Sequence, residues 1–176
     1  MRITKFLPLL LLLVLASCSS VSVNSDYDKK VNFTQFKTYA YLKGGIDKVQ
    51  ISDLDKKRIL RSIDEEMAAK GLTKSDTPDM LVSIFTKENE RVDVYNQNGF
   101  GWGWNPYWGM GMGYTSVSRT PEGTLYIDLI DAKSKELVWQ GEGTGYLTKD
   151  TDKKDERIKE FVSKILAQYP PGSNKK

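Results

Sequence analysis

The stretch between residues 123 and 145 constrains the fold most, because it alternates apolar and polar residues on both sides of a short polar segment. Leu125, Ile127 and Leu129 fall on one side of an extended chain, which is the period of two typical of a strand with one buried face. Residues 131–136 are largely polar and favour a turn, after which the apolar run resumes. The pattern predicts a β-hairpin at the centre of a sheet.

Further strands are predicted upstream of this hairpin. The first few residues from Ser19 favour a tether that leads into an early strand ending near Tyr27, and residues 37–42 alternate like a second strand before the break at Gly44–Gly45. Residues 80–85 are apolar at nearly every position except Ser83, which is typical of a strand buried in the middle of a sheet. The pattern becomes polar towards Tyr95, so this strand is expected to extend past the edge of the core.

Two amphipathic helices are predicted to cover the sheet. Ser52 is expected to cap a helix over residues 53–70, which ends at Gly71. The second helix spans residues 152–169 and ends at two prolines. Their apolar stripes contain Ile59, Leu60, Ile63 and Met67 in the first helix and Ile158, Phe161, Val162, Ile165, Leu166 and Tyr169 in the second. The fold expected is α+β: an antiparallel, hairpin-rich sheet with two helices packed on one face.

The N-terminus has the pattern of a secretory signal peptide. Arg2 and Lys5 precede an apolar run over residues 6–16, which is too short to span a bilayer. The block LASC that ends at Cys18 resembles the lipobox of bacterial lipoproteins. That resemblance implies cleavage before Cys18 and attachment of a diacylglyceryl group to its thiol. The alternative is an ordinary signal peptide with an accidental cysteine at its end.

Lipidation would tether the chain to a membrane, because two or three acyl chains hold a protein there effectively permanently. Ser19 follows the cysteine, which by the sorting rule of enteric bacteria favours the outer membrane, with the domain facing the periplasm. The expected organisation is a lipoprotein signal peptide (1–17), a lipid-anchored tether (18–25), a single α+β domain (26–170) and a flexible tail (171–176).

Residues 96–116 form a segment rich in glycine and aromatic residues, and the chain carries no charge from Val94 to Ser118. Aromatic side chains of this kind stack on sugars, settle at a bilayer interface or anchor a protein partner. The alternative is a long strand-connecting loop that packs some aromatic residues on its own domain. The candidate binding residues are Phe100, Trp102, Trp104, Tyr107, Trp108 and Tyr114.

The residue types needed for most enzymatic mechanisms are missing. The chain has no histidine, and its one cysteine is assigned to lipid, so imidazole bases, thiol nucleophiles and N/S-type zinc sites are excluded. Asp128 and Asp131 form the nearest carboxylate pair for glycoside hydrolysis, but Asp131 also suits a turn. Asp150, Asp152 and Asp155 resemble part of a calcium loop, although helix capping accounts for them better. No cofactor and no metal is expected.

The balance of charges does not indicate a polyanionic partner. The chain has 26 basic and 23 acidic residues, and loss of Arg2 and Lys5 with the leader brings it close to neutral. Nucleic-acid binding usually requires clustered Lys and Arg. We therefore expect no nucleic-acid partner.

Several motifs in order resemble a known family. After the lipobox come FTQFKTYAY at residues 33–41, KGL at 70–72, PDMLV at 78–82, LYIDLID at 125–131 and LVWQG at 137–141. Together they resemble the bacterial lipoprotein family catalogued as domain of unknown function 4136, over nearly the whole mature chain. The resemblance implies a cell-envelope location and no established activity, so it assigns no functional residue.

These observations lead to the expectation of a lipid-anchored envelope lipoprotein that acts as a non-enzymatic binding or structural module. Its partners are expected to be the membrane, through the lipid, and an envelope protein or glycan. One alternative is that the glycine-aromatic segment recognises such a glycan or protein. Another is an enzyme that acts on polysaccharide through Asp128 and Asp131.

Overall fold

The computed structural model describes residues 21–47, 49–96, 115–146, 148 and 150–172. Its strands and helices follow in chain order: β1 (Val21–Tyr27), the 3-10 helix η2 (Phe33–Gln35), β2 (Thr38–Tyr41), α2 (Lys43–Ile46), α3 (Asp53–Ala69), β3 (Thr73–Lys74), β4 (Met80–Asn96), β5 (Thr115–Asp131), β6 (Leu137–Tyr146) and α4 (Thr151–Leu166). The predicted hairpin is present as β5 and β6. Residues 18–25 were predicted to form the tether, but the part of this range that the structure describes, Val21–Ser25, lies in β1.

The six strands form one sheet in the order β1-β6-β5-β4-β2-β3. The pairs β1–β6, β5–β6 and β4–β5 are antiparallel, whereas β2 runs parallel to both β4 and β3. The prediction of a purely antiparallel sheet is therefore wrong, although the α+β class is confirmed. The physical reason is the crossover: α3 lies between β2 and β4 and returns the chain to the end where it started, so β4 enters parallel to β2.

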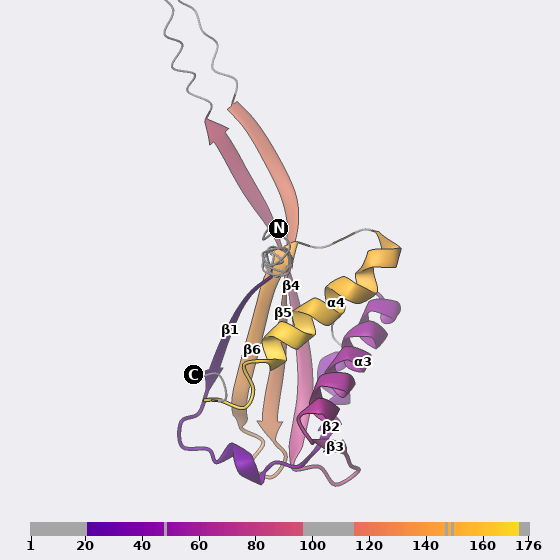
Figure 1. Cartoon of the computed structure of the whole chain (residues 1–176), viewed down its shortest axis with the longest axis vertical. Coiled ribbons are helices and arrows are strands. Elements are labelled where there is room, and N and C mark those ends of the chain that lie inside the picture. Colours follow the sequence, from indigo (N-terminus) through magenta and orange to yellow (C-terminus); the bar gives the residue numbers. More distant parts are fainter. Residues whose placement is uncertain (1–20, 48, 97–114, 147, 149, 173–176) are drawn as a thin grey trace, which may run out of the picture.

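Helices α3 and α4 lie over the same face of the sheet (Figure 1). The alternation predicted for the hairpin holds, since Leu125, Ile127 and Leu129 are buried on this face. The helices contribute the predicted stripes, and their fully buried members are Ile63, Met67, Val162, Ile165 and Leu166. The core therefore lies between one sheet face and the two helices.

Glycines in β6 allow α4 to lie close to the sheet. A Cβ placed on Gly143 would lie 2.9 Å from two side-chain carbons of Ile165, and one on Gly141 would meet both Trp139 and Ile165. The space above Gly141 is filled by the indole of Trp139, which is fully buried and packs edge-on against Tyr169. The alternating glycines thus provide the volume that the largest core side chain needs.

On the opposite face of β4, β5 and β6, the only described helix is the short α2, whose Gly45 lies against Ser83 of β4. Phe85 is 57% exposed there and contacts the ring of Tyr126, with 5.8 Å between the ring centroids. The run from Met80 to Phe85 predicted a strand buried in the middle of a sheet, and β4 does lie inside the sheet, between β5 and β2. Its even-numbered residues are buried under α3 and α4, while Leu81, Ser83 and Phe85 lie on the face that these two helices leave uncovered, where burial is only partial.

The predicted ends of the first helix are confirmed, whereas α4 ends at Leu166, three residues before the predicted end at Tyr169. Ser52 caps α3 by accepting a hydrogen bond from the Asp55 N–H, and Asp150 caps α4 by accepting one from the Asp152 N–H. Gly71 has φ 79°, and the N–H groups of Gly71 and Leu72 donate to the carbonyls of Ala68 and Met67. This is the Schellman ending that glycine favours.

The start of β2 is held to the start of β4 by Asp79. Its Oδ2 accepts hydrogen bonds from the N–H groups of Lys37 and Thr38 and from the Thr38 hydroxyl, and its own N–H donates to that hydroxyl. These bonds lower the pKa of Asp79. They give the Pro78–Asp79 motif a physical role, because they fix the parallel register of β2 and β4.

The central hairpin is longer than the rest of the sheet. Strands β4 and β5 pair over 17 residues each, but β6 ends beside Glu122 and β1 begins beside Gly145. Residues 90–96 and 115–121 therefore form a two-stranded ribbon, here called the hairpin arm, that projects beyond the sheet (Figure 1). Pro121 lies where β6 has ended, in keeping with the restriction of proline to strand edges.

Candidate functional site at the arm end of the sheet

Four strands meet in one row where the hairpin arm leaves the sheet. Val21 pairs with Gly145, Gly145 with Gly123, and Gly123 with Glu88. Strand β1 runs in the same direction as β5, away from the arm, so its first residue is at the arm end. The peptide bond that joins residue 20 to Val21 therefore lies at this end of the sheet.

A cavity opens at the same end, between the first turns of α3 and α4 and the sheet. Its volume is about 700 Å³, within the range of small-molecule sites. Its apolar lining comes from three segments that are distant in the sequence: Ile51, Ile59, Leu125, Ile158 and Phe161. The acidic and basic residues of the lining are equal in number, so its charge favours neither an anionic nor a cationic ligand: Asp55, Glu88, Glu122, Lys87, Lys154 and Arg157.

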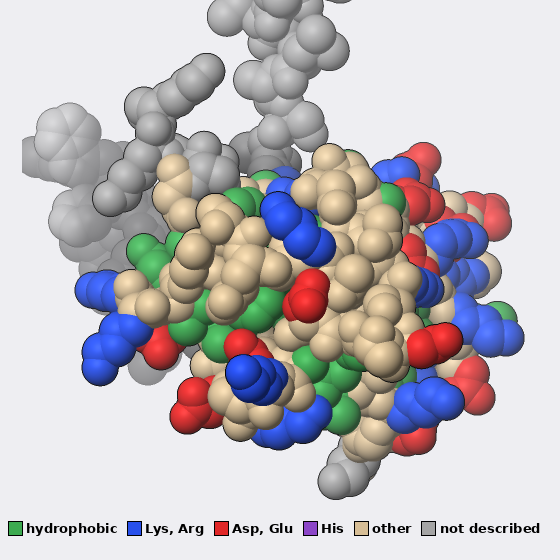
Figure 2. Space-filling model, turned by 90° about the horizontal axis from the view of Figure 1, so that it is seen from below, with side chains coloured by type: hydrophobic (Ala, Val, Ile, Leu, Met, Phe, Trp, Pro, Cys, Tyr) green, Lys and Arg blue, Asp and Glu red, His purple; other side chains and the backbone are tan. Residues whose placement is uncertain are grey.

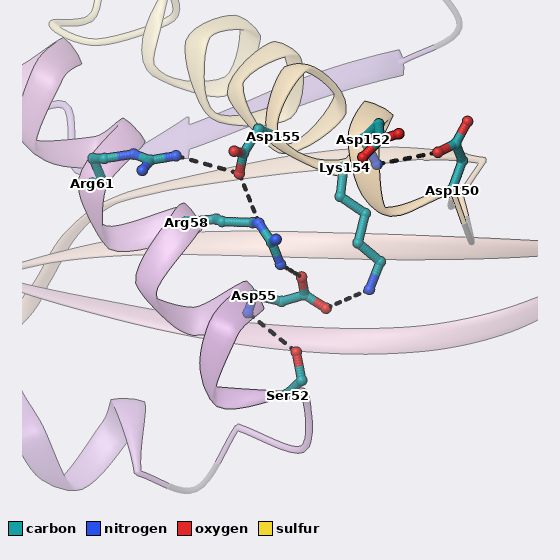
Figure 3. Close-up of polar contacts among 8 residues, drawn as sticks. All are labelled: Ser52, Asp55, Arg58, Arg61, Asp150, Asp152, Lys154 and Asp155. Carbon is teal, nitrogen blue, oxygen red and sulfur yellow. Dashed lines mark hydrogen bonds and ion pairs between the residues drawn. The ribbon is translucent and has the colours of Figure 1, made fainter.

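A network of ion pairs joins α3 to α4 beside this cavity (Figure 3). The two Asp55 oxygens bind Arg58 at 2.8 Å and Lys154 at 2.9 Å, and Arg58 also reaches Asp155 at 2.7 Å. Farther along, Lys159 pairs with Glu65 at 2.8 Å. Residue numbers rise together along both helices in these pairs, so α3 and α4 lie side by side with their N-termini at the arm end.

Asp55 is the centre of this network. Burial acts to raise its pKa, but hydrogen bonds from Lys154, Ser52 and Arg58 outweigh that effect, so the pKa lies below its usual value. The hydrogen bonds that Arg58 donates to Asp55 and Asp155 raise the pKa of Arg58. Both groups therefore stay charged at neutral pH, and the network acts as a clamp between the helices.

A second polar cluster links α3 to β2. The hydroxyls of Tyr39 and Tyr41 both donate to Asp64 Oδ1, at 2.8 and 2.7 Å, and Lys74 pairs with the other oxygen at 2.7 Å. Burial and the bonded carboxylate raise the pKa of both tyrosines. Sequence reasoning missed this cluster, because the alternation of residues 37–42 indicates a strand but not its neighbours.

Several predicted site residues lie outside the described residues. They are the lipidation candidate Cys18 and the candidate binding residues Phe100, Trp102, Trp104, Tyr107, Trp108 and Tyr114. The structure does place both ends of the glycine-aromatic segment, since Asn96 and Thr115 form the last rung of the hairpin arm.

The carboxylates of Asp128 and Asp131 do not come together. Asp128 lies on the uncovered face, where its Oδ1 accepts a hydrogen bond of 2.7 Å from Gln140. Asp131 is three residues along the same strand, so alternation places it on the other face, and its Oδ1 accepts from the N–H groups of Lys133 and Ser134. Asp131 therefore caps the turn, and the geometry required of a glycosidase pair is absent from these two residues.

Within the described ranges, no group of three or more Cys, Asp or Glu residues could hold a metal ion, and no helix there is long and apolar enough to cross a membrane. Figure 2 views the end of the molecule opposite the arm, where basic and acidic side chains are interspersed. This face carries no large patch of one sign.

The cavity and the clamp were not found from the sequence. The sequence does contain the charged residues of the first helical turns, but such residues are equally typical of helix faces exposed to solvent. Their pairing depends on two helices that start 98 residues apart, Asp53 and Thr151, lying parallel and in register. A sequence signal for that register is lacking.

These features define a class: a small α+β domain with two parallel helices on one face of a mixed sheet and a central hairpin that extends beyond it. The family model described as "Domain of unknown function (DUF4136)" matches residues 23–171. The chain belongs to this family.

Solved structures show more distant similarity. A PDZ domain protein from Parabacteroides distasonis ATCC 8503 matches with a TM-score of 0.53 and 19% identity, over 86% of this chain and 36% of that one. This chain thus spans about a third of that protein, and the likeness concerns the fold alone. The PelC dodecamer from Paraburkholderia phytofirmans matches with a TM-score of 0.49 and 13% identity, over 84% and 95% of the two chains. No curated protein matches the sequence.

Proposed function

We propose that the chain is a lipoprotein, anchored through Cys18 in the outer membrane and facing the periplasm, that acts as a non-enzymatic binding or structural module. The observation that carries the proposal is the leader ending in LASC, followed by a domain whose first strand begins at Val21. Cleavage before Cys18 leaves every described strand and helix in the mature chain.

Labelling of cells with radioactive palmitate tests the anchor. The wild-type protein is expected to incorporate label and to sediment with membranes, whereas Cys18→Ser incorporates none. The matched control is Ser20→Ala, which changes a neighbouring residue and keeps the label. Equal labelling of the wild type and Cys18→Ser would remove the proposal.

The non-enzymatic part of the proposal is supported by the residue types and their placement. The chain has no histidine, and Asp128 and Asp131 point to opposite faces with separate structural partners. The cavity between α3, α4 and the sheet suits the apolar part of a small ligand. Its position next to the first residue of β1 would place such a ligand near the anchor.

A second candidate function is recognition of an envelope glycan or protein by the glycine-aromatic segment. The observation that favours it is the hairpin arm, which carries both ends of that segment away from the rest of the sheet. Three of the four tryptophans lie in the segment, while Trp139 is buried in the core.

The test replaces Trp102, Trp104 and Trp108 with alanine and leaves Trp139 in place. We expect the variant to keep its fold, as shown by far-UV circular dichroism and an unchanged thermal unfolding midpoint, and to lose binding to purified sacculi or cross-linking to envelope proteins. A variant that binds sacculi and forms cross-links as the wild type does would contradict this candidate function.

A further inference from the structure

We infer that the hairpin arm lies on the surface of the phospholipid membrane that holds Cys18, as a second membrane contact. The inference rests on the proposed lipid anchor and adds the orientation of the domain. It is carried by the strand register, by the length of chain between Cys18 and Val21, and by the distribution of charge along the arm.

The anchor and the arm share one end of the sheet. Val21 lies in the row that ends at Glu88, and the arm continues from that row. Cys18 precedes Val21 by three residues, which span at most about 11 Å when fully extended. The arm end of the sheet therefore stays within about one strand length of the lipid, whatever path these residues take.

The arm is longer than this tether. Asn96 lies eight residues beyond Glu88, or about 26 Å along the strand. An arm that pointed straight at the membrane would enter it, because the tether holds the end of the sheet closer to the membrane than the length of the arm. An arm that leans over instead lies along the surface.

Two features favour the leaning arrangement. A two-stranded ribbon has two open edges, and unpaired N–H and C=O groups are costly in hydrocarbon, so the described strands cannot pass deep into the bilayer. Charged residues also occupy the rungs nearest the sheet: Glu90, Arg91, Asp93 and Arg119. These rungs belong in the hydrated headgroup region.

The rungs farthest from the sheet carry no charge. They pair Val94 with Val117, Tyr95 with Ser116 and Asn96 with Thr115. Tyrosine is enriched at membrane interfaces, and the valine pair lacks any polar side-chain atom. The outer end of the arm is therefore suited to the boundary between headgroups and acyl chains, and its inner end to water.

The experiment uses the full lipidated protein in phospholipid vesicles. The native cysteine is consumed by lipid, so an introduced cysteine is a unique site for a fluorophore. Val94→Cys labels the outer end of the arm, and Ser134→Cys is the matched control in the β5–β6 turn at the opposite end. Vesicles that contain a lipid with a headgroup-level nitroxide quench fluorophores close to the surface.

We expect at least threefold stronger quenching at position 94 than at position 134. Equal quenching at the two positions, or stronger quenching at 134, would overturn the inference. Flotation of the same samples separates the two hypotheses. Protein that floats with the vesicles but shows no difference in quenching refutes the orientation alone, whereas wild-type protein that fails to float refutes the anchor.

Discussion

Gly143 shows how a single small residue determines the packing of α4 on β6. A Cβ at this position would lie 2.9 Å from two side-chain carbons of Ile165, which is fully buried. We predict that Gly143→Ala lowers the free energy of unfolding by about 1–3 kcal/mol, the usual cost of overpacking a core. Chemical denaturation measures this difference when both proteins also carry Cys18→Ser, which removes the lipid.

Gly44→Ala is the matched control for this prediction. No atom lies within 4 Å of the added Cβ, and the residue lies in helix α2, where alanine stabilises by about 0.4–1 kcal/mol. If both variants change stability to the same extent, the close approach of α4 to β6 is not the cause.

Asp128 is a carboxylate whose ionisation opposes folding. Burial raises its pKa, and the hydrogen bond from Gln140 offsets only part of that effect. The folded state therefore binds the proton more tightly than the unfolded state, and stability falls as pH rises between the unfolded pKa, near 3.8, and the raised folded pKa.

We predict that Asp128→Asn is more stable than the wild type at pH 7, by up to about 1 kcal/mol, because the amide keeps the bond without the charge. The gain should disappear below pH 3.8, where the wild type is protonated in both states. Urea denaturation of the wild type and the variant across this pH range measures the difference in their free energies of unfolding. A variant that is less stable at pH 7, by an amount that does not vary with pH, would contradict the account.

At the scale of elements, the clamp between α3 and α4 depends on Asp55. Its pKa is lowered in the fold, so its contribution is present above the unfolded pKa of about 3.8 and is lost as pH falls through the folded value. We predict that Asp55→Asn lowers the free energy of unfolding by about 1 kcal/mol at pH 7, and that the difference closes at low pH.

Asp53→Asn provides the control, because it removes a carboxylate from the same helical turn. The Asp53 side chain is 90% exposed, whereas that of Asp55 is 18% exposed. Both substitutions remove a negative charge near the helix N-terminus, and the contact of Asp53 with Lys56, at 3.7 Å, is an exposed ion pair that contributes little, so the clamp is the main difference between them. Equal losses at pH 7 would show that the clamp contributes nothing.

The helices and the hairpin follow from local patterns in the sequence. Apolar spacing, the Ser52 cap and Gly71 define α3, and alternation with a polar turn defines β5 and β6, because in each case neighbouring residues determine the conformation. The parallel pairing of β2 could not be predicted in this way. Its three rungs with β4 depend on the path of α3 and on Asp79, which bonds residues 41 and 42 positions away.

The candidate site was predictable only in part. The sequence indicated that the strand after Met80 continues past the core, and the structure shows this extension as half of the hairpin arm. The row that links Val21 to Glu88 is a product of three strand registers and appears in no local pattern. The cavity likewise requires four separate segments to meet.

At the scale of the whole molecule, the N-terminal end of β1, the cavity and the arm lie at one end, and the turn between β5 and β6 lies at the other. This polarity gives a lipid at Cys18 a consequence beyond attachment, because it would turn one particular end of the domain towards the bilayer. With such an anchor, the opposite end, where charges of both signs are interspersed (Figure 2), would face away from the bilayer.

The central claim is that Cys18 is the first residue of the mature chain and carries lipid on its thiol. Mass spectrometry of the N-terminal peptide, from protein purified out of its native membrane, tests this claim most directly. The account predicts a peptide that begins at Cys18 and carries the added mass of a diacylglyceryl group. A mature chain that begins elsewhere, or one whose Cys18 has a free thiol, would contradict it.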